Sequence, residues 1–323
     1  MKLLSLLTSA LAGLAMGLAS PAALAQSPYP SRPVRLILPT PAGGPSDTAA
    51  RALAQALTGS LGQPVVIENK PGAGGSLAAQ ALLAAPPDGY TLLWGLASMA
   101  GIPLLQKSPP FKSLSEFAPV SLVGHFGFTL FTHPDVPAAN VAELVAYAKA
   151  HPDKLSYATG TLGEYMAAAQ FIKATGVRML RVPYKGGAQL MPDLLSGRVQ
   201  VNFGPTSSGL QHARAGKLRM LATMLPEPSA VAPEVPTLAA AGVSTGTLPT
   251  WQAVFAPAGT PREITQRLSA AIAQAVKTPA LRTQFDQQSL QPVGSTPQAL
   301  AEVVVADTQA WQTFVRDYEI PQE

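Results

Sequence analysis

Apolar runs alternate along the chain with amphipathic stretches. Residues 34–38 form a short, mostly apolar run, after which Leu53, Leu57 and Leu61 recur four residues apart. The first pattern is typical of a buried strand and the second of a helix with one apolar face. The alternation continues with expected strands at 65–68 and 91–94 and an expected helix at 76–85. Strands that alternate with helices in this way predict a parallel sheet with helices on both faces.

A second unit of the same kind begins near His133. Asn140, with Glu143 three residues later, predicts a capped helix that runs to about residue 150. Thr260–Pro261 and Thr296–Pro297 each predict a later helix, with threonine as the cap and proline as the first helical residue. Further strands are expected at 156–158, 179–182, 199–203, 218–223 and 251–256, with helices up to 174 and 197 and a long loop from 226 to 249.

The two units together predict an α/β protein of two lobes, each a mostly parallel sheet flanked by helices. We place lobe I at residues 26–124 plus 224–323 and lobe II at residues 125–223. Segments near 119–131 and 218–224 are expected to cross between the lobes and to act as a hinge. Such lobes hold a ligand in the cleft between them.

The first 25 residues have the pattern of a secretory signal peptide. Lys2 supplies a positive charge, residues 3–18 are apolar or small, and Ala23-Leu24-Ala25 is a small-x-small cleavage site. A membrane anchor is the alternative, but it normally needs about 20 apolar residues and lacks a cleavage site. We therefore expect export, to the periplasm if the source is a Gram-negative bacterium.

Composition excludes several classes of function. The chain has no cysteine, only 12% charged residues and a net charge of +4 without any run of Lys or Arg, so thiolate chemistry and nucleic-acid binding are not expected. A dinucleotide fingerprint starting at Gly72 lacks its third glycine, because position 77 is leucine. The four histidines are not spaced as metal ligands. The sequence predicts no metal, no cofactor and no enzymatic activity.

Four expected strands each run into a loop of glycines and small residues that opens a helix, at 40–47, 71–76, 159–163 and 184–187. Glycine lets backbone N–H groups approach a ligand, and a helix N-terminus favours an anion. Glycine is also common at such turns for structural reasons alone, Asp47 suits a helix dipole without any ligand, and Lys185 is either a carboxylate ligand or a solvated loop residue. The candidate ligand-binding residues are Thr40, Ala42, Gly43, Gly44, Ser46, Asp47, Gly74, Gly75, Ser98, Thr159, Thr161, Gly163, Glu164, Tyr184, Lys185, Gly186 and Gly204.

At these loops the chain closely resembles the solute-binding receptors of the tripartite tricarboxylate transporter system, the Bug receptor family. The resemblance rests on motifs at 29–35, 41–47, 68–75, 87–93, 182–186, 215–219 and 256–261. It implies a type II periplasmic-binding-protein fold that captures a small organic carboxylate and delivers it to membrane permease subunits, with the receptor expected to be a monomer. It also implies that one carboxylate is held by backbone groups and ordered waters of segments 40–48 and 72–76, while lobe II meets the far end of the ligand. A periplasmic sensor or interaction protein without a transport role, or an enzyme on the same scaffold, are the alternatives.

The chain departs from the family pattern in lobe II. Family members often have a glycine- and serine-rich turn where this chain has residues 157–164, and Asp or Asn where it has Gly204. Glu164 adds a negative charge near a helix N-terminus, where it would repel a second ligand carboxylate. This predicts a preference for monocarboxylates with an apolar, aromatic or amine-bearing tail over citrate or short dicarboxylates. In the alternative interpretation, Glu164 points to solvent or caps its own helix.

Overall fold

This computed structural model describes residues 29–184, 186–225, 228–229, 231–245, 248, 250–318, 320 and 322. The predicted signal peptide and Lys185 lie outside the described residues. From Arg32 onward the chain forms one compact unit.

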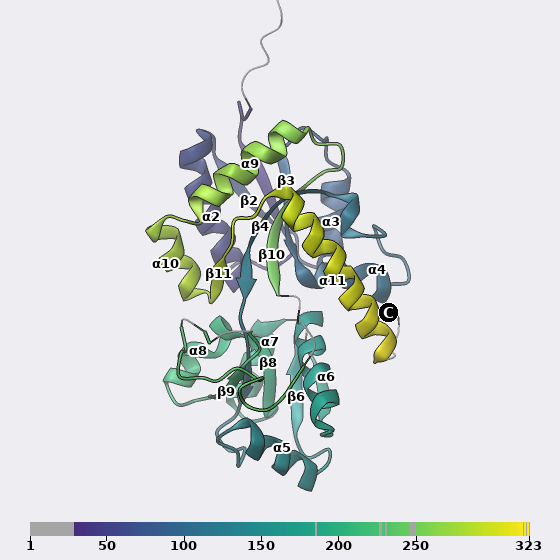
Figure 1. The fold of residues 1–323 in the computed structure, drawn as a ribbon, viewed down its shortest axis with the longest axis vertical. Coiled ribbons are helices and arrows are strands. Elements are labelled where there is room, and N and C mark those ends of the chain that lie inside the picture. Colours follow the sequence, from purple (N-terminus) through teal and green to yellow (C-terminus); the bar gives the residue numbers. More distant parts are fainter. Residues whose placement is uncertain are drawn as a thin grey trace, which may run out of the picture. The chain divides into compact units, whose positions relative to one another are not determined.

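Within the described residues, the first sheet has six strands in the order β11-β4-β10-β3-β1-β2. Here β1 is parallel to β2 and β3, whereas β10 is antiparallel to β3 and β4, and β11 is antiparallel to β4. The strands are β1 (Val34–Leu38), β2 (Val65–Asn69), β3 (Thr91–Leu96), β4 (Ala118–Phe126), β10 (Trp251–Ala256) and β11 (Leu290–Pro292). Helices α2 (Pro45–Leu61), α3 (Ser76–Leu83), α9 (Arg262–Ala275), α10 (Pro279–Gln287) and α11 (Pro297–Asp317) flank this sheet, with short turns α4 (Ile102–Leu105), η1 (Ala73–Gly75), η2 (Ala97–Gly101) and η3 (Leu114–Glu116) (Figure 1).

The second sheet, counted over the same residues, has five strands in the order β7-β6-β8-β5-β9. Here β6 is parallel to β7 and β8, and β5 is antiparallel to β8 and β9. The strands are β5 (Phe128–Thr132), β6 (Ser156–Thr159), β7 (Leu180–Pro183), β8 (Val201–Pro205) and β9 (Arg219–Thr223). The helices of this half are α5 (Val141–Ala150), α6 (Leu162–Thr175), α7 (Gly187–Leu195) and α8 (Thr206–Arg214) (Figure 1).

The observed elements confirm the α/β class and most of the expected strands and helices. Both sheets are mixed rather than mostly parallel, because β4, β5, β9, β10 and β11 pair in antiparallel fashion. The predicted helix caps at Asn140 and Thr296 are confirmed. The Asn140 side chain accepts from the Glu143 N–H at 2.9 Å, and the Thr296 side chain accepts from the Ala299 N–H at 3.2 Å. The predicted Thr260 cap is wrong: its hydroxyl donates to the Pro257 carbonyl at 2.7 Å, and Pro261 is the cap residue of α9.

The chain first passes from the first sheet to the second at Gly127, which lies between β4 and β5. The return segment follows β9 and reaches β10 at Trp251. Its first part belongs with the second sheet, since Leu238 N–H donates to the Thr223 carbonyl at 2.8 Å and Leu238 packs in the core of that sheet. The lobe boundaries predicted from the sequence stay a prediction, and these contacts favour a return crossing later than residue 224.

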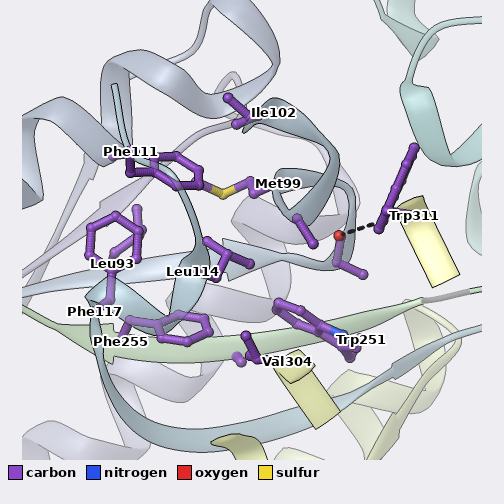
Figure 2. Close-up of a cluster of buried hydrophobic side chains, with 14 of the residues drawn as sticks. Leu93, Met99, Ile102, Phe111, Leu114, Phe117, Trp251, Phe255, Val304 and Trp311 are labelled. Atoms are coloured by element: carbon purple, nitrogen blue, oxygen red, sulfur yellow. Dashed lines mark hydrogen bonds between the residues drawn. The ribbon is translucent and has the colours of Figure 1, made fainter. Parts of the chain in front are cut away.

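A large aromatic core lies between the first sheet, η2 and α11. Figure 2 shows this cluster, in which the Trp311 indole Nε1 donates to the Ala97 carbonyl oxygen at 3.2 Å. Trp251 and Trp311 are 2% and 1% exposed, and a Cβ on Gly101 would meet the Trp311 ring at 2.8 Å. Because that ring fills the space beside Gly101, α11 is held closely against η2, next to the carboxyl end of β3.

We expect Trp311→Ala to lower the free energy of unfolding by about 3–5 kcal/mol, because it leaves a large cavity in this core. Val305→Ala is the matched control on the same helix, since Val305 is 51% exposed, and it should change stability by less than about 0.5 kcal/mol. Urea titration of both variants measures the difference. Equal stabilities would contradict the placement of α11.

Candidate functional site

The strand directions bring the candidate residues to one edge of each sheet. Since β1, β2 and β3 are parallel, the segments that follow them share an edge, and we call residues 40–47, 72–76 and 98 the first-sheet edge. Since β6, β7 and β8 are parallel, residues 159–164, 184, 186 and 204 likewise form the second-sheet edge. The β4 strand ends at the first edge and β5 begins at the second, so Gly127 joins the two edges.

Asp47 holds the loop at the first-sheet edge together. Its carboxylate is 3% exposed and accepts hydrogen bonds from the Gly43 N–H at 2.9 Å, Arg51 Nε at 2.9 Å and Asn69 Nδ2 at 2.8 Å. Burial alone raises the pKa of Asp47, but the bonds from Arg51, Gly43 and Asn69 outweigh burial, so this pKa lies below its ordinary value. These bonds favour the structural interpretation of Asp47, in which its charge is neutralised within its own loop.

Glu164 makes the equivalent contact at the second-sheet edge. It is 4% exposed, its carboxylate accepts from the Gly160 N–H, and its own N–H donates to Thr161 Oγ1 at 3.2 Å. Burial raises the pKa of Glu164 to about 7, against the lowering effect of these backbone bonds. The capping alternative therefore describes the contacts of Glu164. Because its raised pKa leaves the carboxyl partly protonated near pH 7, the predicted repulsion of a second ligand carboxylate loses support.

The loop after β2 has an unusual backbone. Its φ angles are positive at Gly72 (+130°), Ala73 (+46°), Gly74 (+65°) and Gly75 (+109°), a conformation that glycine adopts readily and alanine does not. Gln106 supports it by donating from Nε2 to the Ala73 carbonyl at 3.0 Å. Strained backbone of this kind is often found at binding sites.

Open space lies beside the glycines that would have to admit a ligand. A Cβ built on Gly43 or on Gly74 meets no atom within 4 Å. Gly44, the N-cap residue of α2, supplies no side-chain hydrogen bond to the first turn of the helix. Ser46 is in that turn and accepts from Gln252 Nε2 at 2.7 Å. Ala42 and Ser98 lie at the same edge, exposed and half-buried respectively, and the buried Thr40 Oγ1 has no hydrogen-bond partner among the described residues.

The second-sheet edge contains a cation that the sequence analysis missed. Arg181 donates from Nε to Thr159 Oγ1 at 3.1 Å, and its guanidinium carbon lies 3.7 Å from the centroid of the Tyr165 ring. No carboxylate of the described chain lies within 4 Å of it in an ion pair. The only available signal was its position, directly before the motif at 182–186.

The remaining candidates of this edge have internal roles. Thr161 caps α6, and the Tyr184 hydroxyl donates to Asp193 at 2.9 Å. Gly163 is buried, and Gly186 is the N-cap residue of α7. A Cβ on Gly204 would collide with Oδ1 of Asn202, so the amide of Asn202 takes up the space beside this glycine.

Metal clusters, membrane-spanning helices and surface hollows are the other features of the described residues that could point to a function. No group of three or more metal-ligating side chains occurs among them, and none of their helices is long and apolar enough to span a membrane. A surface hollow of about 640 Å³ lies between α9 and the start of α11, lined by residues such as Arg262 and Ser295, and none of the candidate residues lines it.

Comparisons with known proteins identify relatives of this chain. The sequence profile of the tripartite tricarboxylate transporter family receptor matches residues 49–320. Protein BugT of Bordetella pertussis is 36% identical over 306 residues, which are 93% of this chain and 93% of BugT. A solved R. palustris protein with adipate is 29% identical, with a TM-score of 0.85 over 91% of this chain and 100% of that chain. MatC from Rhodopseudomonas palustris with bound malate is 30% identical, with a TM-score of 0.78 over 89% of this chain and 100% of MatC. The predicted two-lobed binding-protein fold is thereby confirmed.

The burial of Glu164 predicts a pH-dependent stability. Its pKa is raised from 4.5 to about 7, so the folded protein keeps the proton up to a higher pH than the unfolded chain does. Stability from this group is complete below about pH 4.5 and is lost as the pH rises through about 7. Glu164→Gln keeps an acceptor for Gly160 and has no charge to bury. We therefore expect the variant to gain stability relative to the wild type between pH 5 and pH 8, by up to roughly 3 kcal/mol.

Urea titrations of both proteins across this pH range measure the gap. Glu143→Gln controls for the removal of a capping carboxylate, because Glu143 caps the exposed start of α5. A gap between Glu164→Gln and wild type that stays constant from pH 5 to pH 8 would contradict the burial of an ionisable carboxyl at this position.

Proposed function

Because the chain belongs to the receptor family of tripartite tricarboxylate transporters, a family of periplasmic solute-binding proteins, we propose that it captures a small organic carboxylate and delivers it to the membrane permease subunits of such a transporter. Two solved relatives carry the carboxylates adipate and malate. The proposal includes export through the signal peptide at residues 1–25, cleavage near Ala25, a monomeric receptor, and binding without catalysis.

The first-sheet edge is the observation that carries this proposal. It combines a helix start whose cap residue is glycine, a loop of four residues with positive φ, and open space beside Gly43 and Gly74. Backbone N–H groups at such a place bind an anion without any charged side chain. The neighbouring carboxylate of Asp47 is held by Arg51 and Asn69, so it does not leave an uncompensated negative charge there.

The far end of the ligand is assigned to the second-sheet edge. Arg181 supplies a positive charge there, and Thr159 and Tyr165 hold its guanidinium in place. A guanidinium binds a carboxylate with two parallel N–H donors. With Glu164 buried on its own loop, this edge suits a second carboxylate, so the proposed ligand class includes dicarboxylates.

Gly44→Val tests the backbone site without straining the chain. Gly44 has φ −79°, and a Cβ there meets only the Pro41 carbonyl oxygen at 3.8 Å, whereas Gly43 has φ +84°, where any side chain is strained. A branched side chain at the start of α2 should block the approach of a carboxylate and lower its affinity at least about tenfold, at a stability cost near 1 kcal/mol.

The measurement is a screen of mono- and dicarboxylates, including adipate and malate, by thermal shift and then calorimetry on refolded, ligand-free protein. Gly59→Val is the control, since Gly59 lies on the exposed side of the same helix and its Cβ would meet no atom within 4 Å. If no carboxylate binds the wild type, or if Gly44→Val binds as tightly as Gly59→Val, the proposed site is wrong.

Arg181→Gln tests the second-sheet edge with two probes of equal chain length. We expect the affinity for adipate to fall at least about tenfold and the affinity for hexanoate to change less than about threefold, because only adipate has a second carboxylate. Arg178→Gln is the control, because Arg178 pairs with Asp153 on the surface. Equal losses for the two probes would remove Arg181 from the site.

A further inference from the structure

A chain of hydrogen bonds runs from the interior of the first sheet to the first turn of α2. The indole Nε1 of Trp94 donates to Oε1 of Gln252 at 2.5 Å, and Nε2 of Gln252 donates to Oγ of Ser46 at 2.7 Å. Trp94 and Gln252 are 0% and 3% exposed, whereas Ser46 is half-buried at the first-sheet edge. The two buried side chains therefore connect the sheet directly to the proposed ligand site.

The direction of each bond follows from the groups involved. An indole nitrogen only donates, so the side-chain oxygen of Gln252 has to face Trp94. The amide nitrogen of Gln252 then faces Ser46, and the serine oxygen accepts. Ser46 keeps its own hydroxyl hydrogen, which it donates to no acceptor in the described part of the chain.

Ser76, the first residue of α3, is a hydrogen-bond donor to its glutamine, whereas Ser46 is an acceptor. Its hydroxyl donates to Oε1 of Gln106 at 2.9 Å, and the Gln106 amide is fixed in turn because its Nε2 donates to the Ala73 carbonyl at 3.0 Å. Ser76 is only 3% exposed and uses its hydrogen inside the protein. Of these two serines at neighbouring helix starts, only Ser46 can donate to a molecule outside.

We propose that Gln252 is a positioning residue whose amide, held by Trp94, makes the Ser46 hydroxyl a hydrogen-bond donor toward the bound ligand. This inference rests on the proposed function, because it places the ligand head group at the first-sheet edge. A carboxylate oxygen accepts such a bond, and a bond to a charged acceptor is stronger than one between neutral groups. A head group that can only donate, such as an ammonium, leaves this hydroxyl hydrogen unused, so the arrangement favours acceptor oxygens.

Gln252→Glu reverses the direction of the hydrogen bond to Ser46 while keeping the size of the side chain. An ionised carboxylate only accepts, so Ser46 must donate inward and no longer to the ligand. Using adipate as the probe, we expect calorimetry at pH 8 to show an affinity at least about tenfold below wild type. Protonation of the new carboxyl gives Ser46 a donor again, and burial raises its pKa. The affinity relative to wild type should therefore recover as the pH falls toward 6.

Ser46→Ala shows whether Gln252 acts through Ser46. In that background, Gln252→Glu should cost a clearly smaller factor in adipate affinity, and the recovery at lower pH should disappear. Ser60→Ala is the control, because Ser60 lies in the last turn of α2 and its hydroxyl donates to the Leu57 carbonyl at 3.2 Å. Equal losses in the two backgrounds, or wild-type affinity in Ser46→Ala, would overturn the inference.

Neutron diffraction from deuterium-exchanged crystals of the ligand-free wild type shows where the hydroxyl deuterium of Ser46 points, even if adipate does not bind. Failure of adipate to bind would count against the proposed function, while the nuclear density reports the hydroxyl directly. Deuterium on Ser46 Oγ pointing away from Gln252 supports the inference. A deuterium bonded to Ser46 Oγ and pointing at the Gln252 side chain would overturn it.

Discussion

A buried carboxylate in the first turn of a helix holds the loop before it in both halves of the molecule. Asp47 accepts the Gly43 N–H and Glu164 accepts the Gly160 N–H, in each case four residues back along the chain. These bonds fix two loops at the edges where ligand contacts are expected, and they satisfy backbone donors that would otherwise be unpaired. The two carboxylates differ in their partners. Arg51 and Asn69 also bind Asp47, whereas for Glu164 burial outweighs its backbone bonds, so only Glu164 has a raised pKa.

With those loops fixed, backbone and hydroxyl groups define the first-sheet edge. The Gly72–Gly75 turn and the uncapped start of α2 present main-chain groups, and Gln106 and Gln252 set the orientation of one serine each. A site built in this way recognises the shape and acceptor oxygens of a carboxylate rather than countering its charge with a lysine or arginine. The charged group comes from the other half, where Arg181 rests on Tyr165. In the proposed site, recognition of the head group and of the far end thus uses different chemistry in the two halves.

Local patterns in the sequence predicted much of this arrangement. The period of Leu53, Leu57 and Leu61 identified α2, and the Asn140 and Thr296 caps follow short-range rules that survive folding. The contacts that decide whether the Ser46 hydroxyl donates or accepts could not be predicted this way. Trp94 and Gln252 lie 158 positions apart and meet only through the pairing of β3 with β10. Arg181 was missed because its partner Thr159 is on the adjacent strand, and Glu164 was ambiguous because burial, which decides its role, is a tertiary property.

In the proposed site, main-chain groups of the first-sheet edge bind the ligand carboxylate. Backbone amide chemical shifts from a ¹⁵N-labelled protein titrated with adipate test it most directly. We expect the amide signals of Gly44, Ser46 and Gly74 to move most in the first half, and adipamide, which lacks the charge, to leave them nearly unchanged. Binding of adipate with these three signals in place, and with the largest changes elsewhere, would contradict it.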